Sequence, residues 1–557
     1  MKSLKWSSFE EALKLIPMMK HTTLSTLGVL TLSSLACSPA TILTGPGKLS
    51  AQTLNNQAVI SENYADIPIK LTNSGTSEVR LLEFEINGES FDLQDGAYTA
   101  GLQGNCDKNL LAGESCLLWA LGSAQTGDYW VSYTPGDEVK SLGDSYDFAV
   151  PAPSGDPDTD FGGGLGYLLK DVLDDDEIVS VNLLSDEKLL AVGTSLLGTE
   201  GDISVARITS DGDLDASFGS GGLVTIDVAT NSDDRAYDAQ VLADDSVLIG
   251  GSVNDDAAVL KVGADGLLDF SFASSGLLNL DILGGASTSE VNSLIVDNSG
   301  DIFAVGEASL LSGKSDFYAL KLSPSGVPSL LFGVTGIAQV GFGSNNEDIA
   351  NTAVLLSNGS LIMAGSTQPG SGDKDSALVK LSSLGLVDIT FGTLGKRTLD
   401  ICGNNEDDEI LSLIPTSNGK FLAVGYCSDG VDKNGFIARL KSNGALDTSF
   451  GDSSGFTPID ISGEDDVLSK LTSIAGGGFL ATGYATVSGV EQMLTTRILS
   501  DGTLDSSFGT LGTLLTQPDG SSPTRVLDFV VNTTGKFFLG GFLGNSGDTD
   551  LCLIGLE

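Results

Sequence analysis

A short phrase built around phenylalanine recurs along most of this chain. The phenylalanine is usually followed by glycine, and successive copies lie about 54 to 60 residues apart. Four copies keep the wording Leu-Asp-x-Ser-Phe. A unit of this length cannot bury its own apolar face, so tandem copies must stack on one another, and their number largely determines the architecture. The copies lie at Phe161, Phe218, Phe272, Phe332, Phe391, Phe450 and Phe508.

One unit reads as four strands, at residues 222–227, 236–242, 246–251 and 257–262. Asp244 and Asp245 close its middle hairpin, because aspartate tolerates the backbone conformations of tight turns. Seven such units predict an all-β fold, with a seven-bladed β-propeller over residues 158–557. The first phrase precedes the first complete unit and the last unit lacks a following phrase. We therefore expect residues 158–169 to complete the last blade beside residues 551–556 and to close the ring.

The wording Gly-x-Leu-Asp-x-Ser-Phe-Gly, with acidic residues before the second strand, resembles the delta-60 repeat family of bacterial β-propellers. The resemblance covers residues 158–557. It implies the propeller fold, and it implies no particular activity, because that family carries no settled one.

A basic residue precedes the phrase aspartate by eight positions in five units. This spacing predicts an ion pair that braces the phrase of each unit, worth about 0 to 1 kcal/mol where it is exposed. The alternative is a ring of cations that binds phosphate. The remaining units have Lys321 opposite Ser329, and Gly555 in place of the cation. The five pairs are Arg207/Asp215, Lys261/Asp269, Lys380/Asp388, Arg439/Asp447 and Arg497/Asp505.

Acidic residues recur before the second strand in six units, whereas the seventh has Thr524 and Arg525. Equivalent loops of a propeller share one face, so these carboxylates are candidates for a ring that binds calcium, which takes six to eight oxygen ligands. The alternative is that they are solvated turns whose carboxylates cap backbone amides. The candidate residues are Asp175, Asp176, Asp233, Asp234, Glu290, Glu347, Asp348, Asp407, Asp408, Asp465 and Asp466.

The segment before the repeats, residues 52–150, alternates apolar and polar residues at 66–71, 80–86 and 129–133. This period of two, with turns between, predicts a small antiparallel β-sandwich. Residues 71–76 and 106–116 resemble the immunoglobulin-like modules of bacterial surface proteins, which act as spacers or adhesive modules. Residues 151–157, rich in proline, are the expected linker.

The N-terminal residues 20–37 combine a basic start, an apolar run and small residues before Cys37. An apolar run of about 13 residues is too short to cross a membrane, so we expect a signal peptide over residues 1–36, with Met18 and Met19 as candidate starts. Ser34-Leu35-Ala36-Cys37 resembles a bacterial lipoprotein signal. The resemblance implies a lipid on Cys37, a tether at 37–51 and an outer-membrane lipoprotein of the cell envelope, facing the periplasm or the surface.

Export permits disulfides. We expect Cys106 to pair with Cys116. Cys402 and Cys427 are a second candidate pair, although the expected strands place them about 10 Å apart, beyond the usual reach unless the loops bend in. Cys552 alternates with apolar residues and is the expected buried thiol.

Charge and histidine content narrow the function. A formal net charge of -46 repels nucleic acid and anionic lipid, so membrane contact would come through the lipid anchor only. The single histidine, His21, lies in the expected signal peptide, which leaves no imidazole for catalysis or metal binding in the mature chain. We expect a non-enzymatic binding module for a protein or glycan partner in the envelope, without a required cofactor and with calcium as the candidate ion. The alternatives are a calcium-dependent propeller hydrolase or lactonase-like enzyme, and a structural surface component.

Overall fold

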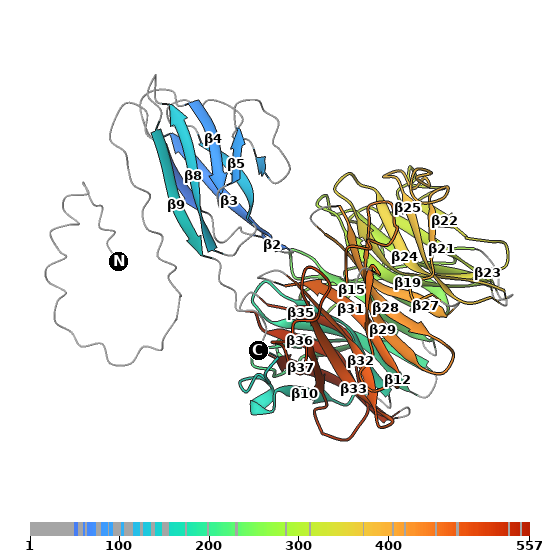
Figure 1. Ribbon diagram of the computed structural model, residues 1–557. Coiled ribbons are helices and arrows are strands. Elements are labelled where there is room, and N and C mark those ends of the chain that lie inside the picture. The colour runs from blue at the N-terminus through green and yellow to red at the C-terminus, as the bar shows by residue number, and fades with distance from the viewer. Residues whose placement is uncertain are drawn as a thin grey trace, which may run out of the picture.

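The computed structural model describes strands between residues 49 and 147, and most of residues 155–556 (Figure 1). Within 155–556 the description leaves out 173–174, 198–199, 229–231, 284–286, 311–313, 371, 404–405, 417–418, 452–453, 475–477, 533–534 and 546–547. Apart from the short 3-10 helix Gly162–Gly164, the described elements are strands, which confirms the all-β class. None of the helices in these residues is long and apolar enough to cross a membrane.

The first nine strands form two antiparallel sheets in the segment where a sandwich is predicted. Cys37, Cys106 and the signal peptide lie outside the described residues, and so does the side chain of Cys116. One sheet contains β1 (Leu49–Thr53), β2 (Val59–Ser61), β3 (Tyr64–Asn73), β6 (Leu102–Gly104) and β7 (Ser115–Gly122). The other contains β4 (Arg80–Ile86), β5 (Glu89–Asp92), β8 (Thr126–Thr134) and β9 (Lys140–Asp147).

Strands β10 to β37 form antiparallel units of four, numbered here along the chain. Unit 1 contains β11 (Asp175–Leu183), β12 (Leu189–Leu197), β13 (Glu200–Ile208) and β14 (Leu223–Ile226). Unit 2 contains β15 (Asp234–Val241), β16 (Val247–Val253), β17 (Asp256–Val262) and β18 (Leu277–Leu280). Unit 3 contains β19 (Ser287–Val296), β20 (Ile302–Leu310), β21 (Lys314–Leu322) and β22 (Ile337–Val340). Unit 4 contains β23 (Asn346–Leu355), β24 (Leu361–Pro369), β25 (Asp375–Leu381) and β26 (Lys396–Leu399).

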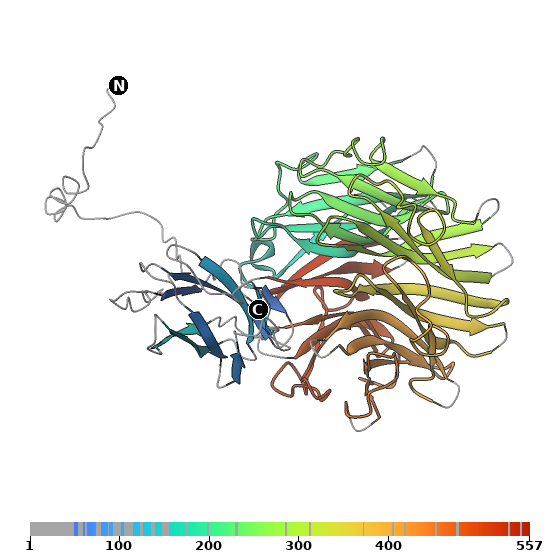
Figure 2. The ribbon, with the colours of Figure 1, turned by 90° about the horizontal axis from the view of Figure 1, so that it is seen from above.

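The remaining units follow the same order, and Figure 2 shows the sheets succeeding one another from green through yellow and orange to red. Unit 5 contains β27 (Asp407–Pro415), β28 (Phe421–Ser428), β29 (Lys433–Leu440) and β30 (Phe456–Ile459). Unit 6 contains β31 (Asp466–Ser473), β32 (Phe479–Val487), β33 (Val490–Ile498) and β34 (Thr513–Thr516). Unit 7 contains β35 (Thr524–Val531), β36 (Phe537–Asn545), β37 (Asp548–Leu556) and β10 (Tyr167–Lys170).

Unit 7 is built from both ends of the repeat region, which confirms the predicted closure. Tyr167 of β10 pairs with Ile554 of β37, and the Asp158 amide donates to the Gly555 carbonyl at 3.0 Å. The ladder thus continues across the two ends of the repeats, and unit 7 takes its fourth strand from the start of the repeat region.

The predicted grouping of strands is wrong by one strand, because the strand predicted to begin each unit is the last strand of the preceding unit. Residues 223–226 belong to the sheet of unit 1, where β14 pairs with β13. The cause is the loop that carries the phrase, because the Arg207 amide donates to Gly222 and the Asp215 amide donates to Arg207. These bonds return the chain to the strand that it has just left, so each unit ends after its phrase.

The phrase phenylalanines pack between successive units. All seven side chains are buried. Six rings lie beside a glycine turn of the next unit, and the ring of Phe508 lies beside Gly155. In unit 3, Phe332 lies against Gly385 of unit 4, whose φ is +71° and where an added Cβ would lie 3.1 Å from the ring. The Gly333 amide donates to the Leu384 carbonyl at 2.9 Å. The phrase therefore joins one unit to the next.

The predicted ion pairs are confirmed in all five units, with Nε or Nζ to Oδ2 distances from 2.8 Å for Arg439–Asp447 to 3.1 Å for Arg497–Asp505. Unit 3 has no aspartate in its phrase, and Lys321 pairs instead with Asp301 at 2.8 Å. In unit 7, Lys536 replaces the missing cation and lies 2.8 Å from Asp158. These cations therefore serve the phrase loops, which disfavours a phosphate-binding ring.

Cys402 and Cys427 form a disulfide with a Cα–Cα distance of 6.3 Å, which corrects the expected separation of about 10 Å. The expectation assumed that both cysteines end strands flanking a third strand in one sheet. Cys402 lies instead in the connection that passes from unit 4 to unit 5, beside the strand that carries Cys427. Cys552 is a buried free thiol, as predicted.

We predict that Phe332→Ala destabilises the protein by about 3 to 5 kcal/mol, because the ring fills the space between two units and the truncated side chain leaves a cavity. The adjacent Leu331 is 83% exposed, so Leu331→Ala is the matched control and should change stability by less than about 0.5 kcal/mol. Urea unfolding followed by far-ultraviolet circular dichroism measures both. Equal losses for the two variants would contradict a joining role for the phrase.

Candidate functional site

A pocket of about 490 Å³ lies where the first strands of the units begin. Its walls come from units 1, 2, 6 and 7, which are far apart in the sequence and are brought together by ring closure. Apolar surface is supplied by Leu196, Pro523 and Phe542. The charged side chains of the pocket are Asp175, Asp176, Glu177, Arg235, Glu491 and Arg525.

Arg525 is held in place by two neighbours from unit 6. Its Nε donates to Glu491 Oε2 at 2.5 Å and its Nη2 contacts Glu491 Oε1, which makes a bidentate pair. Its guanidinium lies 4.2 Å from the ring centroid of Tyr484. The hydrogen bonds that Arg525 donates to Glu491 raise the pKa of Arg525. The guanidinium is therefore a permanent charge with a fixed orientation.

Arg235 and Glu177 complete the polar part of the pocket. Arg235 Nε donates to Asp233 Oδ2 at 2.9 Å. Burial raises the pKa of Glu177, and the positive charges of Arg235 and Arg525 act against this rise. The pocket thus combines two oriented guanidinium groups with a partly buried carboxyl group.

Strand register places Glu177, Arg235 and Arg525 at equivalent positions, each one residue before the position opposite a glycine on the second strand. Glu177, Arg235 and Arg525 are not among the candidates predicted from the sequence, which are the acidic residues named above. The sequence does mark this position, because the series of acidic residues is interrupted at Arg525. The equivalent residues in units 3 to 6 are Glu290, Ile349, Glu409 and Val467.

The second acidic residue of each pair is buried and structural. Its carboxylate accepts the backbone amide of the chain that enters the unit, which confirms capping and corrects the expectation of a solvated turn. In unit 2, for example, the Val228 amide donates to Asp234 Oδ2 at 2.7 Å. The corresponding bonds are Val172 to Asp176 (2.6 Å), Phe342 to Asp348 (2.6 Å), Ile401 to Asp408 (3.1 Å) and Ile461 to Asp466 (2.7 Å).

Three of the first acidic residues also accept backbone amides, in their case from the preceding unit. The Gly201 amide donates to Asp233 at 3.0 Å, Lys374 to Asp407 at 2.7 Å and Lys433 to Asp465 at 2.9 Å. Most acidic pairs therefore link one unit to the next.

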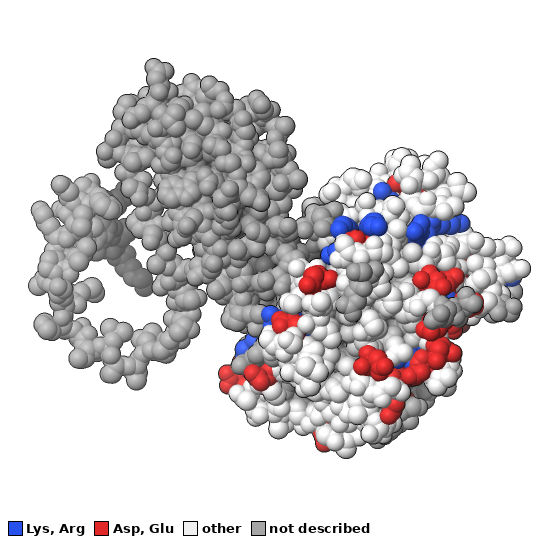
Figure 3. All heavy atoms as spheres, viewed as in Figure 1, with Lys and Arg blue, Asp and Glu red and all other residues white. Residues whose placement is uncertain are grey.

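The predicted candidates do not converge on one cation site. Asp175 contacts Thr549 at 3.3 Å, Glu347 is exposed, and Glu290 lies opposite Glu307 in the sheet of unit 3. Of the candidate acidic residues, Asp175 and Asp176 line the pocket. In Figure 3 the acidic side chains on the visible face form separate clusters.

A second group of carboxyls lies in units 3 and 5. Burial raises the pKa of Glu307 to about 8, and the negative charge of Glu290 is the second largest cause of this rise. Glu409, in contrast, accepts hydrogen bonds from Asn351, Ser366, Tyr426 and Lys374. Glu307 is therefore largely protonated at neutral pH, whereas Glu409 is ionised and fully bonded.

Further along the first strands, Lys470 of unit 6 lies between carboxylates of two other units. Its Nζ is 3.9 Å from Asp528 Oδ1 and 4.0 Å from Asp238 Oδ1. The other oxygens of these aspartates accept amides of the next unit, from Val181 at 2.9 Å and Leu294 at 2.7 Å. Lys470 thus compensates two negative charges that tie neighbouring units together.

Exposed apolar side chains gather on the phrase loops of units 2 to 4. These loops follow the third strands, whose first residues lie at the pocket end, so the apolar loops lie at the opposite end. The equivalent loop of unit 1 has Asp213 and Ala216 where unit 2 has Leu267 and Phe270. The exposed residues are Leu267, Phe270, Val327, Leu330, Leu331, Val334, Leu384, Leu386, Ile389 and Leu394.

A family described as a β-propeller domain of unknown function (DUF5122) matches residues 184–218, 416–450 and 480–508. Each match ends at a phrase phenylalanine, and the match supports a β-propeller fold of the delta-60 type. No curated protein matches this chain.

Several solved structures are similar at low identity. Sqt1 of Chaetomium thermophilum bound to the N-terminus of ribosomal protein L10 is 13% identical, over 70% of this chain and 98% of that chain, with a TM-score of 0.40. Drosophila Plexin A in complex with Semaphorin 1b is 10% identical, over 71% and 86%, with a TM-score of 0.38. A PL25 polysaccharide lyase, an ulvan lyase, is 10% identical, over 69% and 95%, with a TM-score of 0.38.

We predict that the protein loses stability as the pH rises from 6 to 8.5. Burial raises the pKa of Glu307 to about 8 and the pKa values of Asp408 and Asp466 to about 7, above the usual values of about 4 in the unfolded chain. In this window the folded state holds protons that the unfolded state has released, so stability falls with rising pH. Thermal unfolding in EDTA at several pH values measures the slope.

The variant Glu307→Gln should reduce that slope by up to about 1.4 kcal/mol per pH unit, because it removes one titrating group. The matched control is Asp211→Asn, an exposed carboxylate of unit 1 that is not among the charges acting on the pKa of Glu307, and it should leave the slope unchanged. A slope that is the same in both variants would exclude Glu307 as a source of the pH dependence.

Proposed function

We propose that this chain is a non-enzymatic binding protein of the bacterial cell envelope, in which a seven-bladed propeller binds a protein or glycan through the pocket lined by Arg235 and Arg525. The observation that carries the proposal is this pocket of about 490 Å³, in which Glu491 and Asp233 orient the two guanidinium groups. A concave site with apolar walls and a few fixed polar groups is typical of ligand binding. Fixed donors reduce the entropy that binding costs.

The envelope location and the modular layout rest on the N-terminal residues. Cys37 follows a short apolar run and is the proposed site of lipid attachment. The two sheets β1 to β9 are the proposed immunoglobulin-like spacer, and the four-stranded units 1 to 7 are the proposed blades. An acyl anchor followed by a spacer would hold the propeller near the membrane while its pocket stays accessible.

The use of the acidic residues favours binding over catalysis. A carboxylate-dependent enzyme requires acids that converge on one pocket from a few units. Most of the candidates instead accept backbone amides at successive unit boundaries, as Asp348 and Asp408 do. Because these carboxylates recur from unit to unit and bind backbone amides, their role is structural.

We predict that Arg525→Ala weakens capture of the envelope ligand by at least about tenfold, because it removes an oriented, fully charged donor from the pocket. The test is capture of partners from an envelope extract and binding to a glycan array, with the mature chain as bait. Leu331→Ser, at the opposite end of the units, is the control and should bind as the unsubstituted chain does. Circular dichroism confirms folding of both variants.

Two results would overturn this assignment. One is unchanged binding by Arg525→Ala and by Glu491→Gln, which removes the negative charge that pairs with Arg525. The other is loss of binding in Leu331→Ser alone, which would place the contact on the apolar loops.

Glu177 favours a second candidate, the propeller hydrolase or lactonase-like enzyme. A partly buried carboxyl group with a raised pKa, lying in a pocket beside positive charges, has the properties of a general acid. The test is hydrolysis of ester and lactone substrates with and without calcium. We expect activity above the level of Glu177→Gln if this candidate is correct, and equal, negligible rates in both proteins if the binding function alone is correct.

A further inference from the structure

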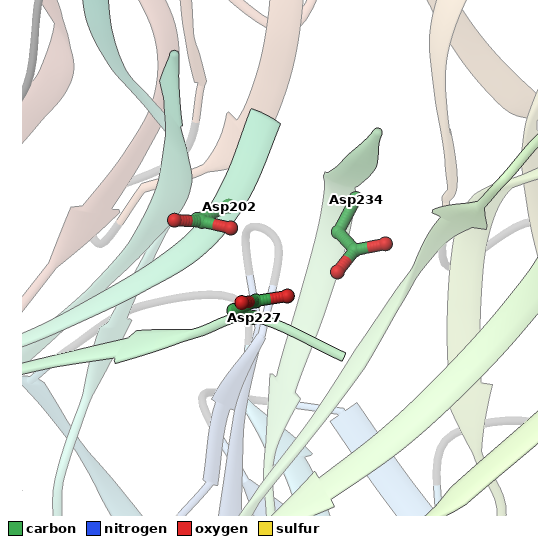
Figure 4. Close-up of side chains that lie close together, drawn as sticks. All are labelled: Asp202, Asp227 and Asp234. Atoms are coloured by element: carbon green, nitrogen blue, oxygen red, sulfur yellow. The ribbon is translucent and has the colours of Figure 1, made fainter. Parts of the chain in front are cut away.

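Three carboxylates meet at the boundary between units 1 and 2, outside the pocket. Asp202 is on β13, Asp227 directly follows β14, and Asp234 begins β15. One oxygen from each lies within 4.8 Å of the others. Figure 4 shows the three side chains approaching one another from separate strands. The third and fourth strands of one unit and the first strand of the next therefore each contribute one ligand atom.

The oxygens of Asp234 differ in their partners. Oδ2 accepts the Val228 amide at 2.7 Å. Oδ1 is buried and has no hydrogen-bond partner, and Asp234 as a whole is inaccessible to solvent. A buried carboxylate oxygen without a donor is costly, because it has lost its water and gained nothing in exchange. One oxygen of Asp234 belongs to the group of three carboxylates, and its Oδ1 has no protein partner, so the side chain can offer a ligand atom.

The local charge is wholly negative. The charged groups that lie beside Asp202 are Asp227, Asp234 and Glu200, and all three are acidic. The nearby Arg235 is engaged by Asp233. Because like charges at this distance repel, a cation bound between the three carboxylates would stabilise their ionised forms.

We infer that Asp202, Asp227 and Asp234 bind one divalent cation, with calcium as the favoured ion, at the boundary of units 1 and 2. Carboxylate oxygens are the ligands that calcium prefers, and its flexible shell accepts mono- or bidentate carboxylates with water at the remaining positions. Asp227 is exposed and leaves room for that water, whereas Asp234 forms the dry inner side. The ion would join two units, and it is independent of the proposed ligand pocket.

Other unit boundaries provide natural comparisons. Between units 2 and 3 the equivalent residues are Asp256, Asp281 and Ser289, so one carboxylate is missing and Ser289 Oγ instead accepts the Ala257 amide at 3.0 Å. Between units 4 and 5, Asp408 accepts amides on both oxygens, from Ser376 at 3.0 Å and Ile401 at 3.1 Å. In neither case does a third carboxylate offer a free oxygen.

The test is isothermal titration of calcium chloride into the EDTA-stripped full chain in about 0.15 M potassium chloride, which screens diffuse binding to the acidic surface. We expect one saturable site per chain and a rise in melting temperature of at least about 2 °C at saturating calcium. Asp227→Asn should weaken this binding by at least about tenfold and abolish the melting shift. Because Asp227 is exposed, this variant should fold.

Asp256→Asn is the matched control, since it removes a carboxylate from the equivalent boundary that has two. It should keep both the stoichiometry and the affinity of the unsubstituted chain. The inference is overturned if the unsubstituted chain shows no saturable binding below about 10 mM calcium, a concentration beyond that of weak extracellular sites. It is also overturned if Asp227→Asn binds as tightly as Asp256→Asn, and the choice of calcium is overturned if magnesium saturates the site and calcium does not.

Discussion

The contact on which the rest of the structure depends is the phenylalanine of each phrase, buried against a glycine turn of the next unit. A four-stranded sheet of this size has two faces and cannot bury either alone. Phe332 under Gly385 illustrates the solution, because the missing Cβ lets the backbone of one unit lie on the ring of another. The same geometry brings Phe161 against Gly212, so the first phrase packs on unit 1 while β10 completes unit 7.

Carboxylates also join successive units, through a second set of contacts. The acidic pairs before each first strand accept amides from the entering chain and from the preceding unit, as Asp408 and Asp407 do. Replacing one of these carboxylates should destabilise the protein, because a buried amide that loses its acceptor costs free energy. The chain has a net charge of -46, and many of its carboxylates therefore lie inside the structure, at the boundaries between units. The polar pocket and the three-carboxylate group arise where this pattern is altered or supplemented.

Some of this could be predicted because it is local. The recurrence of the phrase predicts stacked β units, and the spacing of eight residues predicts pairs such as Arg439–Asp447, since both partners lie on one strand and the loop that returns to it. The closure of the repeats follows from the leftover phrase at Phe161. The grouping of strands was mispredicted because turn residues mark where strands end and not which sheet they join. The distance between Cys402 and Cys427 was mispredicted for the same reason, since it depends on the path between two sheets.

The sequence by itself determined the class of fold and the ion pairs, because each depends on residues within one repeat of about 54 to 60 positions. Tertiary structure alone decided which residues form sites. Arg235, Arg525 and Glu177 come from units 2, 7 and 1, and they meet because the ring closes. Asp202 and Asp227 look like ordinary acidic residues until the third and fourth strands of one unit are laid beside the first strand of the next. Proximity between repeats depends on how sheets are placed around one another, and no periodicity along the chain records that placement.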